Sequence, residues 1–269
     1  MNLKRIFAVA LTSLVFAVAT LSGSGARATA FSTDQSDVWS VAGEPGWAIQ
    51  LVQRGSVIFA TMYVYGPSGQ ATFYTATLEA QVAPFTWSGD LIATTGPWFG
   101  AVPFNPAFVT TRKVGTMTWN STSVSTGTLT YSVDGVVVVK SLVRYLARYD
   151  DYSGLYIASF HDDSTGCFNP VDNGSTEATA PLGVGQSGLS ISFALSGPGD
   201  TCTFSGTLSQ AGQIGQVTGA YTCTVGDFGT FTFFELNVGV NYLTGRYSTS
   251  GTNDGCKSTG YFAGMRHRP

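Results

Sequence analysis

The sequence predicts an all-β protein: two consecutive antiparallel up-and-down β-barrels, or barrel-like domains, after a signal peptide. Three observations predict this class. Only 11% of the 269 residues are charged, 33 are glycine, and helical periodicity is almost absent. A glycine followed by a strand pattern recurs, as in KVGTMTW, FSGTLS and LTGRYS, and such glycines permit the coiling that barrel closure requires. Finally, all tryptophans precede and all cysteines follow a polar joint at residues 148–153, which divides the chain.

Residues 1–30 have the pattern of a secretory signal peptide. Lys4 and Arg5 precede the uncharged apolar stretch 6–21, and Ala-x-Ala patterns then offer cleavage points. We therefore expect an exported protein, either periplasmic or extracellular. No later segment is apolar enough for a membrane helix. An outer-membrane barrel is disfavoured because the chain ends in Met-Arg-His-Arg-Pro rather than in an aromatic strand, so we expect no membrane insertion.

The charge distribution argues against a nucleic-acid partner. After residue 30 the chain has 10 basic and 16 acidic residues, a net charge of 10 − 16 = −6, and neither sign is clustered. A nucleic-acid surface requires grouped Lys and Arg. The sequence contains no cofactor motif and no CxxC metal spacing, so neither a cofactor nor a metal is expected.

The first domain is predicted over residues 31–147. Its eight expected strands lie near 37–41, 47–54, 57–65, 70–79, 85–94, 114–120, 126–133 and 136–146. Asp134-Gly135 suits a type I′ hairpin turn, and Gly55-Ser56 suits a two-residue turn. The apolar, proline-containing segment 96–106 is expected to be a loop.

The second domain is predicted over residues 150–269. Seven strands are expected near 154–161, 187–196, 200–209, 217–225, 228–238, 241–249 and 256–264. The polar segment 170–185 is expected to be a long loop, with an eighth strand left open. A single two-sheet sandwich for the whole chain is the alternative architecture.

Four cysteines in an exported protein predict two disulfides, with three possible pairings. A hairpin centred between Gly212 and Gln213 places opposed residues at positions summing to 425, which brings Cys202 opposite Cys223. Cys167 is then expected to bond to Cys256. The same register places Phe204 opposite Tyr221, on the face that carries the cysteines.

The candidates for catalysis are few. His161 and the carboxylates near it, with Asp172, Glu177 or Asp254 as possible neighbours, offer an acid–base pair. Glu235 lies in an apolar strand, where a carboxylate tends to have a raised pKa. A solvated turn and an outward-facing strand residue are the simpler interpretations of these two features. The chain has no strand–turn–helix that would support a nucleophile elbow.

Residues 46–78 predict two faces of one sheet. Opposed residues summing to 111 and then to 135 place Trp47 and Phe73 on a packed face. The other face mixes aromatic hydroxyls, an amide and a guanidinium, which is typical of a binding surface. The candidate ligand-binding residues are Tyr63, Tyr65, Tyr74, Gln50 and Arg54.

Parts of the chain resemble known proteins. Pro45-Gly46-Trp47, the run FATMYVY at 59–65 and TGPWFG at 95–100 resemble a pattern in a family of secreted bacterial β-rich proteins. TCTFSGTLSQAG and VTGAYTC resemble a module of such proteins. The resemblance implies secretion and β architecture, and no particular activity. A looser analogy is to the avidin and lipocalin barrels, which bind small ligands in their mouths.

Taken together, these patterns favour an exported, non-enzymatic protein that binds a small molecule or glycan, mainly through the first domain. The alternatives are a structural or cell-surface assembly protein and a hydrolase that uses Glu235 or the His161 cluster. The oligomeric state is left open.

Overall fold

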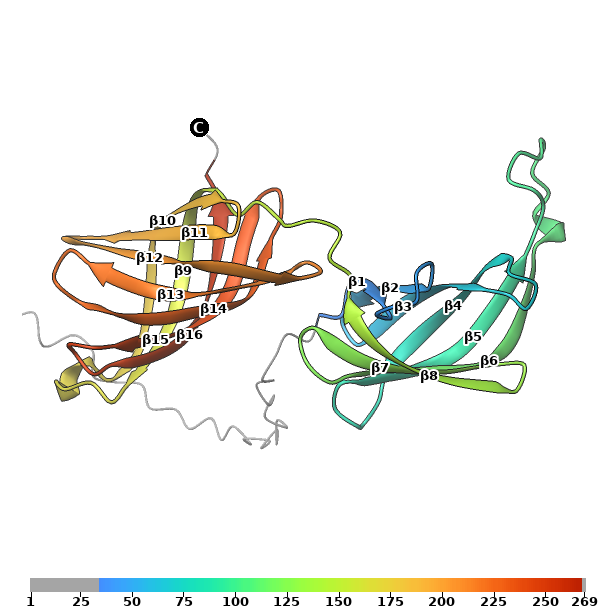
Figure 1. Cartoon of the computed structure of the whole chain (residues 1–269), viewed down its shortest axis with the longest axis horizontal. Helices are drawn as coiled ribbons and strands as arrows, with labels where there is room; N and C mark the ends of the chain where they lie inside the picture. The colour runs from blue at the N-terminus through green and yellow to red at the C-terminus, as the bar shows by residue number, and fades with distance from the viewer. Residues whose placement is uncertain (1–33, 268–269) are drawn as a thin grey trace, which may run out of the picture. The chain divides into compact units, whose positions relative to one another are not determined.

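Residues 34–267 are described in the computed structural model, and they form two closed eight-stranded antiparallel barrels, each with its strands in sequence order (Figure 1). The predicted fold class is confirmed, and the alternative of a single sandwich is wrong. The expected signal peptide, residues 1–30, lies outside the described residues. In the described part of the chain, no helix is long and apolar enough to cross a membrane.

The first barrel contains the eight strands expected in residues 31–147. They are β1 (Asp37–Ser40), β2 (Ala48–Arg54), β3 (Val57–Tyr65), β4 (Ala71–Ala80), β5 (Thr86–Thr95), β6 (Thr110–Ser121), β7 (Thr126–Val133) and β8 (Val136–Arg144). Between β5 and β6 the predicted apolar loop is present, and it contains the short 3-10 helix η1 (Pro106–Phe108). Asp134 and Gly135 have φ angles of 48° and 87°, as the predicted hairpin turn between β7 and β8 requires.

The second barrel also has eight strands. They are β9 (Gly154–Thr165), β10 (Gly174–Ser187), β11 (Ser190–Gly197), β12 (Asp200–Ala211), β13 (Ile214–Cys223), β14 (Phe228–Val238), β15 (Tyr242–Gly251) and β16 (Lys257–Arg266). The expectation of a long loop at 170–185 is wrong, because β10 occupies most of that segment. Only the η2 turn (Pro170–Asp172) and its flanks remain outside strands.

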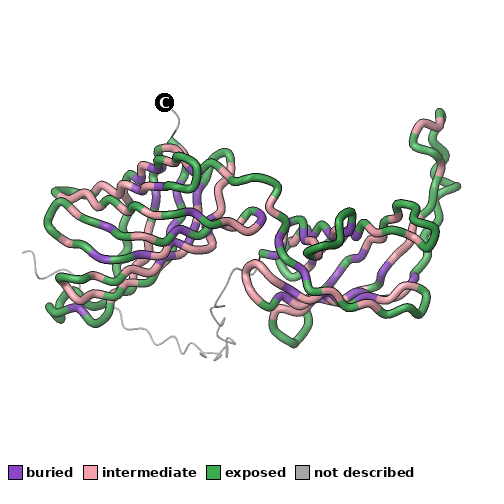
Figure 2. Tube along the Cα trace, viewed as in Figure 1, coloured by how far each residue is buried: buried purple, intermediate pink, exposed green. Residues whose placement is uncertain are grey.

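Large apolar side chains fill the first barrel. Figure 2 shows buried and other positions alternating along its strands, as expected for a barrel with one packed face. Trp39 and Trp119 are fully buried and meet edge to face, with ring centroids 4.7 Å apart. The fully buried Gln35 accepts from both indoles, through its backbone carbonyl from Trp39 and through Oε1 from Trp119. The predicted packing role of Trp47 is confirmed, since it is 8% exposed.

The faces of β4 are the reverse of those predicted. The expected β2–β3 register is confirmed, but β3 pairs with β4 through Met62–Tyr74 and Tyr63–Phe73. Gly66 donates to the carbonyl of Gln70, so five residues rather than four form this loop. One extra residue moves every β4 side chain to the opposite face. Tyr74 therefore packs against the core, and Phe73, predicted to be buried, is 49% exposed.

Candidate functional site

The interior of the second barrel contains a cavity of about 270 Å³. Its walls are aromatic or aliphatic except for Asp162, the hydroxyl of Tyr247 and Thr249. The lining residues are Phe160, Asp162, Ala178, Ala180, Leu182, Leu195, Phe204, Tyr221, Phe233, Tyr247, Thr249 and Phe262. They come from all eight strands of the barrel, because inward positions recur at every second residue of each strand.

The aromatic rings form one connected wall. Phe204 stacks on Tyr221 at 5.2 Å between ring centroids and lies 5.3 Å from Phe233. Phe233 in turn lies 6.0 Å from Phe262, which stacks on Phe160 at 5.6 Å. These separations lie within the range of favourable aromatic pairs. The wall is therefore held in place by its own ring contacts.

The cavity lies toward one end of the barrel and is open there. Phe160, Leu195 and Phe204 point inward but are only partly buried, and Ala178 is exposed. The other end is filled by buried side chains, among them Tyr152, Leu208 and Leu236. The barrel is thus packed at one end and hollow at the other.

Both disulfides lie at the hollow end, and both predicted pairings are confirmed. Cys167–Cys256 joins the β9–β10 connection to the β15–β16 connection, and Cys202–Cys223 joins β12 to β13. The predicted register is also confirmed, with Phe204 opposite Tyr221. Because Cys202 and Cys223 each lie two residues from one of these rings, on the same face, their bond forms the outer border of the aromatic wall.

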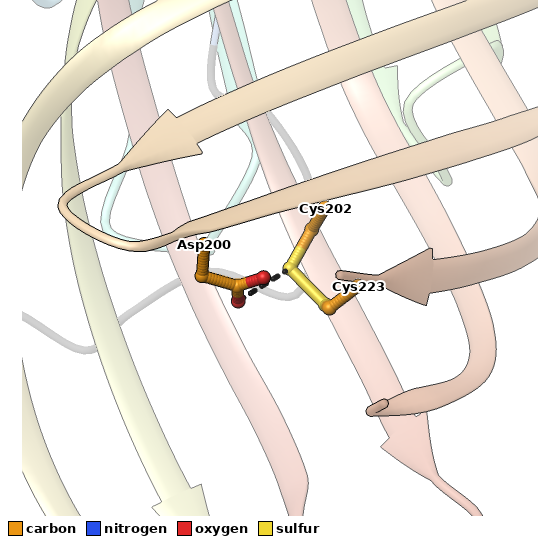
Figure 3. A group of neighbouring side chains, drawn as sticks. All are labelled: Asp200, Cys202 and Cys223. Atoms are coloured by element: carbon orange, nitrogen blue, oxygen red, sulfur yellow. Dashed lines mark hydrogen bonds between the residues drawn. A yellow bond between two sulfur atoms is a disulfide. The ribbon is translucent and has the colours of Figure 1, made fainter. Parts of the chain in front are cut away.

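Asp200 lies beside this second disulfide, with one carboxylate oxygen 3.5 Å from the sulfur of Cys202 (Figure 3). These three residues have the proximity of a metal-ligand cluster. Metal ligation by cysteine requires thiolate sulfur, however, and both sulfurs are bonded to each other. Asp200 instead accepts from the hydroxyl of Thr224 and the backbone N–H of Val225, which lowers its pKa and organises the β13–β14 turn.

One carboxylate faces the cavity. Asp162 accepts a hydrogen bond of 2.9 Å from the hydroxyl of Tyr247 through Oδ1 and one of 2.7 Å from Ser164 through Oδ2. Burial, followed by the negative charge of Asp162, raises the pKa of Tyr247, so its hydroxyl stays protonated and continues to donate. A carboxylate offers about four lone-pair sites, and the two hydrogen bonds leave acceptor capacity at the cavity wall.

The sequence-predicted ligand residues do not form one surface. Gln50, Arg54, Tyr63 and Tyr65 lie on the outer face of the first barrel, as expected, and all four are exposed. Tyr74 lies on the inner face, so it is separated from them by the sheet. The outer surface instead gains Phe73, directly opposite Tyr63.

The two predicted catalytic candidates both lie on the outside of the second barrel. Glu235 has a φ angle of 53° at a bulge of β14, where the register with β15 shifts. Its carboxylate lies 3.3 Å from Nη1 of Arg246. His161 lies between two carboxylates, with Nδ1 2.5 Å from Glu177 and Nε2 3.2 Å from Asp163, and it stacks on Tyr261. Neither candidate faces the cavity.

The environment of His161 predicts a measurable titration. The hydrogen bond to Glu177, followed by that to Asp163, raises the pKa of His161 above its ordinary value of 6.5. Since the folded-state pKa is the higher one, this contact stabilises the fold below pH 6.5, and the contribution disappears as pH rises through the folded-state pKa. An NMR titration of the imidazole should show the raised value, and Glu177→Gln should lower it. An unchanged midpoint in Glu177→Gln would contradict the assignment of Glu177 as the main cause.

The cavity itself was not predicted from the sequence, although the residue pattern contains part of its signal. The hairpin register had already placed Phe204 and Tyr221 on one face with the cysteines. All five tryptophans lie in the first domain, so the sequence marks that domain, rather than the phenylalanines of the second, as the aromatic binding domain. Ala178 and Ala180, which leave the space open, carry no local signal.

Comparison of the whole chain with models of known protein families and with curated protein sequences finds no match.

Proposed function

We propose that this is an exported, non-enzymatic binding protein that holds a small, largely apolar molecule in the cavity of its second barrel. The observation that carries the proposal is the aromatic cavity, open at one end and about 270 Å³ in volume. Small-molecule pockets are typically about 300–1,000 Å³ and mostly apolar with a few polar groups. An apolar cavity of about 150 Å³ already binds benzene, so this larger, open-ended cavity suits a ligand of one to three rings.

The mechanism of binding follows from the walls. Aromatic and aliphatic surface inside the open barrel faces water. When a ligand covers this surface, binding is favoured by about 25 cal/mol for each Å² of apolar area removed from water. The wall is preformed by ring stacking and by the disulfide border, so little order is lost on binding. The two disulfides are consistent with an oxidising compartment outside the cytoplasm.

Filling the cavity tests this function. Ala180 lines the cavity on β10, whereas the adjacent Thr179 is exposed on the outer face. N-phenyl-1-naphthylamine, a neutral probe whose fluorescence rises in apolar surroundings, should bind the wild-type protein in a 1:1 ratio. Ala180→Phe should weaken this binding by about 10-fold or more, because close-packed interiors leave no room for both rings. Thr179→Phe is the matched control and should leave the affinity unchanged.

Equal affinity in the wild-type protein and Ala180→Phe would refute the proposed site. Probe fluorescence is preferable to intrinsic tryptophan fluorescence, since all five tryptophans precede residue 120 and lie in the first barrel. The thermal midpoint of Ala180→Phe should equal or exceed that of the wild-type protein, because filling a cavity commonly stabilises by about 0.5–2 kcal/mol.

The outer face of the first barrel supports glycan binding as a second function. Phe59, Tyr63, Tyr65 and Phe73 are 46–58% exposed on adjacent strands, and Gln50 and Arg54 lie on the same face. Flat exposed rings bordered by amide and guanidinium groups suit stacking on sugars.

Tyr63→Ala/Phe73→Ala should abolish retention on insoluble peptidoglycan, cellulose or chitin, whereas Val137→Ala/Val139→Ala, which removes exposed apolar surface from β8, should not. If both double variants show the same retention, or the wild-type protein shows none, this second function is wrong. Self-assembly through the same rings would appear instead as a concentration-dependent particle size.

A further inference from the structure

We infer that the cavity selects a ligand with a cationic head, an alkylammonium or quaternary ammonium group, seated between the aromatic wall and Asp162. This inference rests on the proposed function, since it names the class of ligand that the same cavity binds. Three independent features of the second barrel carry it: the polarity of the lining, the state of Asp162, and the distribution of charge around the open end.

The lining has one formal charge, and it is negative. Asp162 is the only ionisable carboxylate among the lining residues, and none of them is Lys, Arg or His. Five of the twelve are aromatic side chains with faces or edges at the cavity, in addition to Tyr247 itself. Rings attract cations through their negative faces, and cages of this composition recognise quaternary ammonium groups. An anionic ligand would meet the same faces and the carboxylate with repulsion.

Asp162 lacks a cationic partner within the described residues. The hydroxyls of Tyr247 and Ser164 donate to it, and it belongs to none of the ion pairs found between residues 34 and 267. Its neighbours on β9, His161 and Asp163, point to the outer face, where His161 pairs with both Asp163 and Glu177. A carboxylate at the edge of an apolar cavity gains most from a counter-charge, because the lower local dielectric strengthens the attraction.

The open end of the barrel is strongly acidic. Residues 154–266 contain eight carboxylates against Arg246, Lys257 and Arg266, a formal charge of 3 − 8 = −5. Seven of the eight carboxylates belong to the strand ends and connections at the hollow end. Among the described residues at that end, Lys257 is the only lysine or arginine. The seven are Asp162, Asp163, Asp172, Glu177, Asp200, Asp227 and Asp254.

Burial and, in addition, the negative charges at the open end raise the pKa values of the two tyrosines that line the cavity, Tyr221 and Tyr247. Burial is the first cause that raises the pKa of Tyr221, and the charges of Asp254 and Asp227 add to it. For Tyr247 the carboxylates that add to the effect of burial are Asp162, Asp163 and Glu177. Negative potential at a cavity mouth concentrates cations there and favours their entry.

The experiment compares two ligands of one shape and different charge. Trimethylphenylammonium is cationic and tert-butylbenzene is its neutral counterpart. Both are titrated into the full-length protein, and binding is followed by NMR shifts of the aromatic resonances. The cation should bind tighter than the neutral ligand by about 10-fold or more, the sum of cation–π attraction and a charge-assisted contact.

Asp162→Asn and Asp163→Asn provide the matched pair of variants, because both remove one carboxylate from adjacent positions of β9. Asp162→Asn should remove most of the preference for the cation and leave the affinity for tert-butylbenzene within about 3-fold, which also shows that the variant is folded. Asp163→Asn, on the outer face, should retain the preference, with at most a small loss from the long-range field.

The outcomes separate the two proposals. Binding of tert-butylbenzene with equal or weaker binding of the cation overturns the inference and leaves the proposed function intact. A loss of both ligands in Asp162→Asn also overturns it, since Asp162 would then act on the shape of the cavity. Failure of both ligands with the wild-type protein overturns the proposed function, and the inference with it.

Discussion

Replacing Arg144 with alanine is expected to lower the free energy of unfolding of the first barrel by about 3–5 kcal/mol, the cost of leaving a buried charge without its partner. Arg144 is 4% exposed, and its Nη1 lies 3.0 Å from the carboxylate of Asp37, which is 6% exposed. Burial lowers the pKa of Arg144, while Asp37 opposes that shift. The guanidinium nevertheless stays charged at neutral pH, as arginine does in proteins.

The position of Arg144 explains why the effect should be large. β1 and β8 close the barrel through only two residue pairs, Trp39–Arg144 and Ser40–Val143. The guanidinium also donates to three backbone carbonyls, those of Val124, Ser36 and Asp34. It lies over the ring of Trp39, 4.6 Å from its centroid. The Arg144 side chain therefore connects the β6–β7 turn to residues 34–37 across the short β1–β8 pairing, which is called the seam below.

The measurement is urea unfolding followed by tryptophan fluorescence, which reports on the first barrel alone. Arg112→Ala is the control, because Arg112 also pairs with an aspartate but does so in solvent, with side chains 62% and 56% exposed. Exposed pairs contribute about 0–1 kcal/mol. Arg144→Lys should fall between the two, since a lysine keeps the charge but cannot reach four acceptors in a planar fork. Equal losses for Arg144→Ala and Arg112→Ala would contradict the role of the seam.

The sequence was sufficient to predict the architecture wherever short turns determine the register. The hairpin at Gly212-Gln213 is a two-residue turn, with Gly212 at a φ angle of 55°, and the predicted pairing of Cys202 with Cys223 followed from it. The same reasoning succeeded at Gly55-Ser56. In each case the turn itself sets the pairing, so local information is enough.

The predictions for the β3–β4 loop and for β10 were wrong because the interactions that determine them are not visible in the local residue pattern. At Gly66–Gln70 the fifth loop residue is recruited by side-chain contacts, in which Gln70 Oε1 accepts from the backbone of Ser68, and no residue type marks that choice. The segment of β10 was expected to be a loop, because the side chains of its first half are exposed on both faces. It is a strand only because β9 pairs with it along eleven residues.

The candidate site was the least predictable feature. A cavity is defined by volume that no side chain fills, and this depends on which small residues of one strand oppose which rings of another. Ala178 and Ala180 on β10 face the same interior as Phe204 and Tyr221 on β12 and β13. β10 pairs with β9 and β11 and not with β12 or β13, so the meeting of its alanines with these rings follows from closure of the barrel rather than from any one hairpin.

The second large effect is expected from removing a disulfide. Cys167→Ala/Cys256→Ala should lower the stability of the second barrel by about 4.6 kcal/mol, because the bond closes a loop of 89 residues and so restricts the unfolded chain. Cys202→Ala/Cys223→Ala should cost less, about 3.3 kcal/mol, for a loop of 21 residues. Urea unfolding followed by amide NMR signals of the second barrel would measure both, and the reverse order would contradict the loop argument.

The loss of ligand affinity is expected to be larger for the disulfide whose removal costs less stability. This difference distinguishes a bond that shapes the cavity from one that only stabilises the barrel. Cys202–Cys223 borders the aromatic wall through Phe204 and Tyr221, whereas Cys167–Cys256 joins two connections beyond it. In water, where both variants remain folded, N-phenyl-1-naphthylamine should bind more weakly to Cys202→Ala/Cys223→Ala than to Cys167→Ala/Cys256→Ala. The variant that loses less stability should therefore lose more affinity. Parallel losses would mean that both bonds act on the cavity only through the stability of the barrel.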